Sequence, residues 1–542
     1  MKKIFVAKKI ITMDASHPFA THVAVENGKI VGIGDSEMKE LFSDAILDET
    51  FKDQVILPGF VEGHAHMVAG QDGLAAYVGY FDRPSPEGTI LKGLKSMDEI
   101  ITYLKTCDAK LSPDEPLIAT GFDPIYFEGK RVERYDLDKI TTERMIFLMH
   151  ASGHLITTNS KAIEAIPADK LASTQGVAKD DQGKPTGELQ EIQAMSLAFA
   201  LLGASFLKFT DPKVLFPRFV ALAQRAGVTT ITEMGVDINL DDPRSIEELS
   251  SLTEHVSLRV VPMYFVPTST KKIEDMPAYV QSLVAKNTDR LRFGLVKFMA
   301  DGSIQGYTAR LKAPYITGVE NGIWNMDPEK IQLCTKAFHD AGLSIHCHCN
   351  GDEASEVFIA AVKDAIAQKP WPDNRHIIQH GQMIDEAQFQ DMKKLGMGAN
   401  LFTNHIYFWG DQHVAKTIGL ARAEKMDAAN TALSLGVPFS LHCDASVTPI
   451  APLFNAWTAV NRVTASGKVL GEAEKISVAD ALYAMTMGSA YLLRMENEIG
   501  SIMVGKKADF VVLGEDPYEI DPMKLKDIPV ITTIFTGENT KH

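Results

Sequence analysis

The sequence predicts an α/β fold, a (β/α)8 TIM barrel with a small composite β-sandwich built from both termini. Three observations predict it: apolar strands alternate with amphipathic helices through the middle of the chain, eight such strands can be counted, and short alternating strands occupy both ends. Strands that alternate with helices form a parallel sheet, and enough repeats close that sheet into a barrel. We therefore assign residues 1–57 and 491–542 to the sandwich and 58–490 to the barrel.

The two ends of the chain carry the strands of the predicted sandwich. KIFVAKKIITMD and THVAVENGKIVGIG alternate apolar and polar residues, and Asn27 with Gly28 favours a tight hairpin turn. GSIMVGKKADFVVLGEDP and VITTIFTGEN near the C-terminus have the same pattern. Neither end can form a core alone, so we expect the two ends to pair with each other.

The barrel strands are predicted where an apolar run precedes a helical pattern: 55–62, 228–233, 259–264, 294–299, 344–348, 376–380, 397–402 and 439–443. The stretch GIWNMDPEKIQLCTKAFHDAGLSIHCH illustrates one helix and the strand after it. Asp327 is a favourable N-cap, Pro328 suits the first helical position, and Gly342 ends the helix. The apolar face of this helix consists of Ile331, Cys334, Phe338 and Ala341.

The eight-strand count requires an insertion at about 72–215, directly after the first barrel strand. This segment has further strand-like runs at 117–120 and 145–149. A large loop at this place lies over the carboxyl ends of the barrel strands, where the active sites of such barrels are built. We expect the insertion to act as a lid and to supply specificity residues.

The composition indicates a protein that acts on a small molecule. A formal net charge of -16 provides no basic surface for a nucleic acid or an anionic membrane. The five cysteines contain no CxxC pair, which argues against a disulfide framework or a zinc ribbon. The N-terminal stretch is a poor signal peptide, and no run approaches the roughly 20 apolar residues of a membrane span. We expect a cytoplasmic protein.

Six ionisable residues lie on or just after the predicted barrel strands: His64, His66, Lys297, His348, His380 and Asp444. Five of them stand at or just past a carboxyl end, where the active sites of such barrels are built. Side chains alternate along a strand, so His64 and His66 face the same side. Imidazole and carboxylate groups are first-choice ligands for zinc or a similar divalent ion.

Lys297 does not fit this set as an ammonium group. A positive charge in an apolar strand that points into a cationic site is costly unless the amine is deprotonated or modified. A neutral lysine can react with carbon dioxide to form a carbamate, an anion that can bridge two metal ions. Carboxylation would therefore turn Lys297 into a ligand.

The motifs PGFVEGHAH, SGHLITTNSKAI, GKPTGELQE, VKFMADGS, HCHCNGDEA, IIQHGQ and IGSIMVGKKADFVVLGEDP together extend through nearly the whole chain. With them the chain resembles the amidohydrolase superfamily, specifically its YtcJ-like branch (amidohydrolase 3), which includes N-substituted formamide deformylase. The resemblance implies a (β/α)8 barrel, a composite β-sandwich and a mono- or binuclear metal centre. It places the metal ligands at His64, His66, carboxylated Lys297, His348, His380 and Asp444.

Three stretches depart from this family pattern. HCNGD and HCDAS replace the commoner HAIGD and SDAP-like forms, and ANLFTNHIYFWGD stands where relatives usually carry a Gln-Pro. The ligand set survives these changes. The altered loops face the expected pocket. The resemblance therefore says less about the substrate of this protein than about its metal ligands.

The resemblance implies hydrolysis of a C–N bond in an amide, N-acyl or N-formyl group. A divalent ion can lower the pKa of water from about 16 to about 7, and the resulting hydroxide attacks the carbonyl. We expect Asp444 to act as the general base that returns the proton to the leaving amine. In a binuclear centre, His64 and His66 bind one ion with Asp444, His348 and His380 bind the second, and Lys297 bridges. In a mononuclear centre some of these histidines polarise the carbonyl instead.

Two further residues are candidate substrate contacts. His154, in HASGHLITTNS, can reach down from the insertion, with a structural histidine as the alternative. Asp301, in ADGS, can bind substrate or orient Lys297, with a turn-forming Asp-Gly as the alternative. Six aromatic residues are expected to face the pocket and suggest an apolar or aromatic substituent on the substrate, although aromatic residues are as often core residues: Tyr77, Phe122, Tyr126, Tyr307, Phe408 and Trp409.

Other histidines and cysteines near the predicted ligands are interpreted as structural. His346 is the substitute ligand if His348 is not one, since both share a strand face. His376 and His442 share faces with His380 and Asp444 and are interpreted as structural. Cys347, Cys349 and Cys443 alternate with the ligands, so they are expected to be small core residues.

Two rival functions stay open. One is deamination of a heterocycle or opening of a cyclic amide at the same site. The other is a noncatalytic barrel used for assembly or binding, which the filled ligand positions disfavour. A homodimer is compatible with the family resemblance, but no stretch of the sequence indicates its interface.

Overall fold

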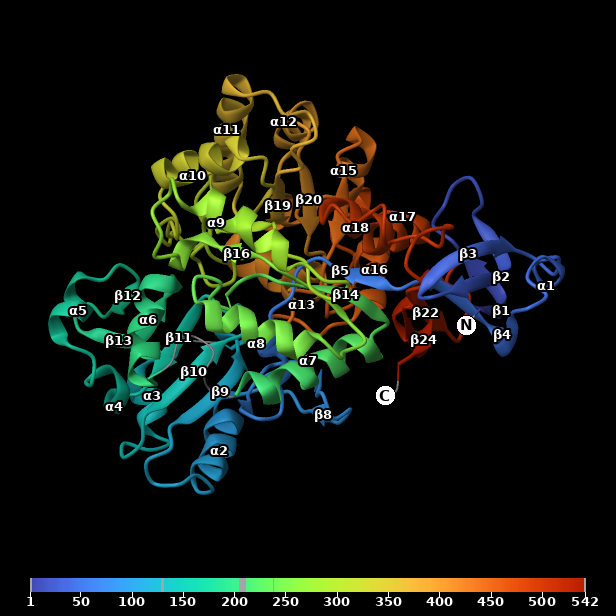
Figure 1. Ribbon diagram of the computed structural model, residues 1–542. Helices are drawn as coiled ribbons and strands as arrows, with labels where there is room; N and C mark the ends of the chain where they lie inside the picture. Colours follow the sequence, from blue (N-terminus) through green and yellow to red (C-terminus); the bar gives the residue numbers. More distant parts are fainter. Residues whose placement is uncertain (1, 128–130, 204–210, 237, 541–542) are drawn as a thin grey trace.

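The computed structural model describes residues 2–127, 131–203, 211–236 and 238–540 (Figure 1). At its centre is a barrel of parallel strands. The first part of the barrel pairs β5, β14 and β15, and the second pairs β16 to β21 in chain order. The strands are β5 (Phe60–Glu62), β14 (Val228–Glu233), β15 (Arg259–Pro262), β16 (Tyr264–Phe265), β17 (Val296–Met299), β18 (Ile345–Cys349), β19 (Ile377–His380), β20 (Gly398–Leu401) and β21 (Phe439–Leu441).

Two connections close this sheet into a barrel. Met263 separates β15 from β16, and the N–H of Tyr264 donates to the carbonyl of Leu295, which leads into β17. On the other side, Ala65 and Ala445 form a parallel bridge just past β5 and β21. Each of the eight predicted barrel strands overlaps an observed barrel strand, with β15 and β16 counted as one. The first was predicted too long, because residues 55–58 belong to β4 (Ile46–Pro58), which lies in a different sheet.

Helices follow the barrel strands along the chain. Their bounds are α7 (Pro212–Arg225), α8 (Pro243–Thr253), α9 (Met276–Leu283), α10 (Pro328–Asp340), α11 (Asp352–Gln368), α12 (Glu386–Lys394), α13 (Asn404–Gln412), α14 (Leu420–Ala423), α15 (Ala429–Leu435), α16 (Pro452–Asn461), α17 (Val478–Tyr483) and α18 (Ser489–Leu492). The predicted helix at 328–341 is α10, which begins at Pro328 and ends before Gly342, whose φ is +72°. Asp327 stands at the N-cap, but its side chain makes no capping hydrogen bond.

Strands from both ends of the chain form one seven-stranded sheet. Its order is β24-β23-β22-β4-β1-β2-β3, so β4 lies between N-terminal and C-terminal strands. The bounds are β1 (Lys2–Ile11), β2 (Phe19–Glu26), β3 (Lys29–Gly34), β4 (Ile46–Pro58), β22 (Phe510–Leu513), β23 (Val530–Phe535) and β24 (Glu538–Asn539), with α1 (Met38–Leu41) before β4. Asn27 and Gly28 form the predicted hairpin turn with φ of +51° and +74°.

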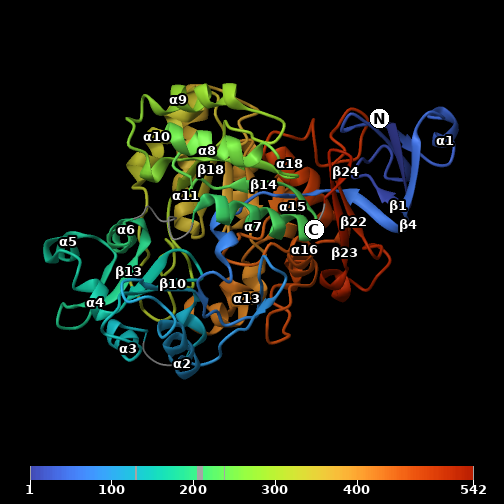
Figure 2. The same cartoon turned by 60° about the horizontal axis from the view of Figure 1, so that its bottom comes forward.

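The segment between β5 and α7 forms its own six-stranded sheet, on the opposite side of the barrel from the seven-stranded sheet (Figures 1 and 2). Its order is β12-β13-β11-β10-β9-β6. The elements are β6 (Ala76–Tyr77), β7 (Arg83–Pro84), β8 (Ile90–Leu91), α2 (Met97–Asp108), β9 (Leu117–Phe122), α3 (Arg134–Asp138), β10 (Ile146–His150), β11 (Leu155–Thr158), α4 (Ser160–Ile163), α5 (Ala168–Ser173), β12 (Val177–Lys179), β13 (Pro185–Gln190) and α6 (Glu191–Leu201).

The strand-like runs predicted at 117–120 and 145–149 are β9 and β10. Residues 128–130 and 204–210 of the predicted insertion, and 541–542 of the predicted sandwich, lie outside the described residues. Within the described part of the chain, no helix is long and apolar enough to cross a membrane.

Candidate metal centre and active site

A cavity of about 440 Å³ opens at the carboxyl ends of the barrel strands. All six predicted ligand residues line it: His64, His66, Lys297, His348, His380 and Asp444. The opposite wall comes from the inserted segment, through His154 and the residues Glu191, Ile192, Met195, Ser196, Phe199 and Ala200 of α6. The inserted segment therefore lies over the carboxyl ends of the barrel strands, in the position that the sequence analysis predicts.

His64, His66 and Asp444 form one compact group. The Nε2 atoms of His64 and His66 lie 3.6 and 3.7 Å from Oδ1 of Asp444. Oδ1 is buried and has no hydrogen-bond partner among the described residues. Burial raises the pKa of Asp444 to about 6, although the nearby Lys297 lowers it. The backbone of Asp444 is left-handed, with φ of +52°, a strain often found at functional sites.

His380 and His348 lie next to this group in the same cavity. Nδ1 of His380 lies 3.5 Å from Oδ2 of Asp444, and its Nε2 is buried with no partner among the described residues. The ring of His348 lies 4.5 Å from that of His380, centroid to centroid. Nε2 of His348 lies 3.1 Å from the carbonyl oxygen of Gly302, to which it can only donate. Nδ2 of Asn350, which can only donate, lies farther from the same nitrogen, at 3.3 Å. The shorter contact with Gly302 favours a protonated Nε2, with the lone pair on Nδ1.

A hydrogen-bonded layer beneath these residues fixes two histidine tautomers. Oε1 of Gln379 lies 2.7 Å from Nδ1 of His64 and also accepts from Nδ2 of Asn400. Nε2 of Gln379 lies 2.7 Å from Nδ1 of His346. An amide oxygen only accepts, so Nδ1 of His64 carries the proton and its Nε2 faces the cavity with a lone pair. Nδ1 of His346 accepts a hydrogen bond from Nε2 of Gln379, so its lone pair is not available to a metal ion. His346 is therefore a weak candidate for the substitute ligand.

Lys297 is buried in the same cavity. Its side chain is 2% exposed, and Nζ has no hydrogen-bond partner among the described residues. Burial lowers the pKa of Lys297 to about 8, against the opposing effect of Asp444. The neutral amine, which is the form that reacts with carbon dioxide, is therefore far more populated at neutral pH than in an ordinary lysine.

The donor set fits a divalent metal ion. Nε2 of His380, Oδ1 of Asp444 and Nζ of Lys297 are buried polar atoms without partners in the described chain, and buried polar atoms normally have partners. Neutral imidazoles and a carboxylate are ligands that zinc accepts. Two clusters of potential ligand atoms are present among the described residues, His64 with His66 and Asp444, and His64 with His380 and His442. His348 lies outside both clusters.

Two buried glutamates that the sequence analysis missed hold the ends of the strands. Oε1 of Glu62 accepts from the backbone N–H groups of His64 and Cys443, each at 3.1 Å, and so joins β5 to the segment after β21. Oε2 of Glu233 accepts from the N–H of Met67 at 2.6 Å. An acidic residue in an apolar strand, as in VEGHAH, is the signal that could have found Glu62.

His154 lines the cavity as predicted and is held by a residue the sequence analysis missed. Its Nδ1 lies 2.8 Å from Oε2 of Glu191, which also accepts from Nδ2 of Asn325 at 2.6 Å. Burial lowers the pKa of His154, but the charge and hydrogen bond of Glu191 outweigh burial and raise it. The His154 ring lies 4.9 Å from the ring of His348. Glu191 therefore aims His154 at the predicted metal centre.

Asp301 is arranged differently from the predicted substrate contact. It is fully buried, and its carboxylate accepts from the backbone N–H groups of Arg310, Asn350 and Gly351 at 3.0, 3.0 and 2.8 Å. It is not among the residues that line the cavity. Burial raises the pKa of Asp301 to about 7. Its geometry favours holding the loops after β17 and β18 together over contacting substrate.

The prediction that six aromatic residues line the pocket is wrong. None of Tyr77, Phe122, Tyr126, Tyr307, Phe408 and Trp409 lines the 440 Å³ cavity. Phe122 belongs to the core of the inserted sheet, and Tyr77, Tyr126, Phe408 and Trp409 line a separate small cavity between the insertion and the loops of the barrel. The aromatic residues of the main cavity are Phe199 and Phe265, joined by the apolar Ile192, Met195 and Met299.

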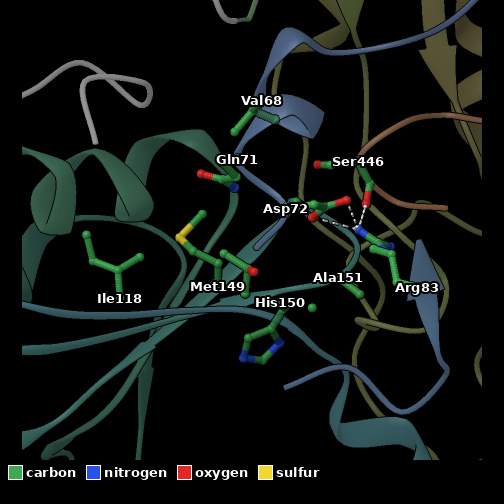
Figure 3. A pocket seen from close by; sticks show the side chains of 12 residues that line it. Val68, Gln71, Asp72, Arg83, Ile118, Met149, His150, Ala151 and Ser446 are labelled. Atoms are coloured by element: carbon green, nitrogen blue, oxygen red, sulfur yellow. Dashed lines mark hydrogen bonds and ion pairs between the residues drawn. The ribbon is translucent and has the colours of Figure 1, made fainter. Parts of the chain in front are cut away.

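A side cavity of about 50 Å³ shares Val68, Gly153 and Ser446 with the main one (Figure 3). Here Arg83 of β7 donates through Nη1 to the carbonyl of Ser446 at 2.7 Å and through Nη2 to that of Val447 at 2.8 Å. Asp72 lies 3.4 Å from Nη1 and pairs with the guanidinium (Figure 3). The insertion thus clamps the segment that follows Asp444.

His376 and the cysteines behave as the sequence analysis interpreted them. Nδ1 of His376 accepts from the N–H of Ile345, so its Nε2 donates to Nδ1 of His339 at 3.0 Å. His376 directly precedes β19, His339 lies in α10, and neither residue lines the cavity. Cys347, Cys349 and Cys443 are fully buried.

Comparison with known proteins finds relatives along the whole chain. The chain is 26% identical to the putative amidohydrolase YtcJ of Bacillus subtilis over 99% of both chains. It is 23% identical to the N-substituted formamide deformylase of Arthrobacter pascens, over 97% of this chain and 96% of that protein. An uncharacterized metal-dependent hydrolase of Pyrococcus horikoshii has a similar structure, with 21% identity and a TM-score of 0.72 over 96% of this chain and 99% of that one. The profile of the amidohydrolase family matches residues 52–540, and the chain therefore belongs to this family.

Proposed function

We propose that this protein is a metal-dependent hydrolase that cleaves the C–N bond of an amide, N-acyl or N-formyl group in a small substrate with an apolar substituent. One observation carries the proposal: six predicted ligand residues from distant parts of the chain line one cavity, and three of them have buried polar atoms without partners among the described residues. The relative named as a formamide deformylase supports the choice of bond.

His64, His66, His380 and Asp444, with His348 and a carboxylated Lys297, would hold one or two divalent ions, zinc first among them. When bound, such an ion polarises the substrate carbonyl and makes water a stronger acid. The chain itself supplies the protonation chemistry. Asp444, with a pKa raised to about 6 by burial, accepts a proton from the attacking water and delivers it to the leaving nitrogen.

The insertion orients and selects the substrate. His154, aimed by Glu191, donates a hydrogen bond to a polar group of the substrate. Ile192, Met195, Phe199, Phe265 and Met299 form the apolar part of the cavity and hold the substituent. A substituent that fills this apolar part displaces water from it, which strengthens the polar contacts at the reacting end.

A matched panel of amides tests this proposal. N-formyl and N-acetyl derivatives of benzylamine and hexylamine are compared with those of glycine and with a set of amino-substituted heterocycles and cyclic amides. We expect release of free amine from the apolar members, at least tenfold faster than from the glycine derivatives, and none from Asp444→Asn. Ammonia release from a heterocycle would establish the deaminase alternative instead, and a metal-free protein inactive on every member would favour a noncatalytic barrel.

A further inference from the structure

His442 stands two residues before Asp444 in a fixed position inside the barrel. Its backbone N–H donates to the carbonyl of Leu401 at 3.2 Å, and its carbonyl accepts from Nδ2 of Asn455 at 2.6 Å. Ser440, on the same face of the chain, donates to Oδ1 of Asn400 within the hydrogen-bonded layer of the barrel. The imidazole of His442 therefore points into the barrel, between this layer and Asp444.

Neither nitrogen of His442 has a hydrogen-bond partner in the part of the chain that the structure describes, and its side chain is fully buried. A neutral imidazole offers one N–H and one lone pair, and leaving both unsatisfied in the interior is costly. The rings on either side give no polar contact: Phe402 stacks at 4.9 Å and His64 at 4.7 Å between centroids. His376, by contrast, has both nitrogens engaged.

A nitrogen of His442 lies close to ring nitrogens of two other buried histidines. One nitrogen each from His64, His380 and His442 lie within 4.8 Å of one another, and all three residues are buried. Nε2 of His380 is itself without a partner among the described residues. Three neutral imidazoles are a donor set that binds zinc. We call His64, His380 and His442 the three-histidine group.

The three-histidine group shares His64 with the group of His64, His66 and Asp444. His64 has its Nδ1 hydrogen-bonded to Gln379, so it offers one nitrogen to a metal. One imidazole nitrogen binds one ion, and an ion at His64 therefore occupies either group but not both at once.

We propose that His442 is a metal ligand and that the three-histidine group is a second, deeper position for the ion bound to His64. An ion bound by the three-histidine group would leave both oxygens of Asp444 free to accept a proton. An ion bound by His64, His66 and Asp444 would instead take Oδ1 of Asp444 as a ligand. This inference rests on the metal centre of the proposed function and adds to it a ligand outside the six residues that the family resemblance implies.

Cobalt(II) is a suitable probe because its visible spectrum reports on the ligands directly. The purified full-length protein is stripped with a chelator and titrated with Co2+, with a competing chromophoric chelator to obtain the affinity. His442→Gln removes the imidazole, and His442→Cys replaces it with a thiolate, which also binds such ions. His376→Gln is the matched control, because it removes an equally buried imidazole outside the cavity. Near-UV circular dichroism checks that each variant is folded.

We expect His442→Gln to weaken Co2+ binding at least tenfold and to change the visible bands, and His442→Cys to add a thiolate-to-cobalt charge-transfer band. His376→Gln should match the wild type in both. Unchanged affinity and bands in His442→Gln, or stoichiometric Co2+ in His442→Cys without the new band, would overturn the proposal. If His442→Gln does not fold, His442→Cys decides.

The same titration separates this inference from the proposed function. Wild-type protein that binds no Co2+ contradicts both. Wild-type protein that binds Co2+ and hydrolyses an amide, with His442 variants that bind as the wild type does, contradicts only the role of His442.

Discussion

Nδ1 of His154 lies 2.8 Å from Oε2 of Glu191, so a histidine that follows β10 is aimed by the first residue of α6, 37 positions later. Asn325 donates to the same carboxylate oxygen and to the carbonyl of Asp301. Through Asn325, the pair connects the insertion with the loop after β17. Glu191 has left-handed backbone, φ of +65°, which shows that its placement is held against a conformational cost.

Replacement of Glu191 tests its role as a positioning residue. Glu191→Gln retains an acceptor for His154 but removes the charge that raises the pKa of His154, and Glu191→Ala removes both. We expect kcat/KM to fall about tenfold in Glu191→Gln and about a hundredfold in Glu191→Ala. Each tenfold loss corresponds to about 1.4 kcal/mol of transition-state stabilisation. The alkaline limb of the pH profile should move to lower pH in Glu191→Gln, because neutral His154 appears earlier. Equal losses with an unshifted profile would mean that Glu191 only supports the fold.

Much of this architecture follows from the sequence. The barrel strands are recognisable because fully buried strands are continuous apolar runs, and the ligands because they stand where those runs end. Glu191 was not recognisable, since its partners lie 37 and 134 positions away and only folding brings them together. The aromatic residues were misassigned because a sequence does not tell which side of a loop faces a cavity. For the same reason, the unpartnered nitrogens of His442 are visible only in the structure.

Lys297→Ala tests the bridging role predicted for this lysine. If a carboxylated Lys297 bridges two ions, the wild type should contain about two metal ions per chain and the variant at most one, measured by elemental analysis of protein purified without chelator. Added bicarbonate should raise the metal content of the wild type after stripping but not that of Lys297→Ala. One ion per chain in both proteins, insensitive to bicarbonate, would remove Lys297 from the centre.

Arg83→Met tests the clamp on the segment after Asp444. The substitution leaves Asp72 as a buried charge without its partner and frees the carbonyls of Ser446 and Val447. Loss of one member of a buried ion pair typically costs about 3–5 kcal/mol, so the melting temperature should fall by several degrees and kcat with it. Asp72→Asn combined with Arg83→Met should recover part of the stability. A double variant less stable than Arg83→Met would contradict the pairing.

Asp123 should make stability depend on pH. Burial raises its pKa from 3.8 to about 6, although the hydrogen bond from Nε1 of Trp409 at 2.8 Å lowers it. The folded protein therefore binds a proton that the unfolded chain releases, and the resulting stabilisation is present below pH 4 and lost as the pH rises through about 6. Relative to Asp123→Asn, which does not titrate, the wild type should lose up to about 3 kcal/mol between pH 4 and 7.

Thermal unfolding of both proteins at matched pH values, each in the same buffer series, measures this difference. Effects of acid on the histidines of the proposed metal centre are common to the two proteins and cancel. A gap between the two melting temperatures that stays constant over this range would mean that Asp123 remains ionised when folded.

The seven-stranded sheet places β4 between strands from opposite ends of the chain, with Leu57 and Val511 as register partners. During synthesis, β1 to β4 leave the ribosome long before β22 exists, at translation rates of roughly 5–20 residues per second. One edge of β4 therefore stays unpaired for roughly 20 to 90 seconds, until β22 has been synthesised. An unpaired strand edge can pair with strands of other chains. Premature termination, or slow translation of the last part of the message, should therefore make the whole nascent chain aggregate and not merely leave one domain unfolded.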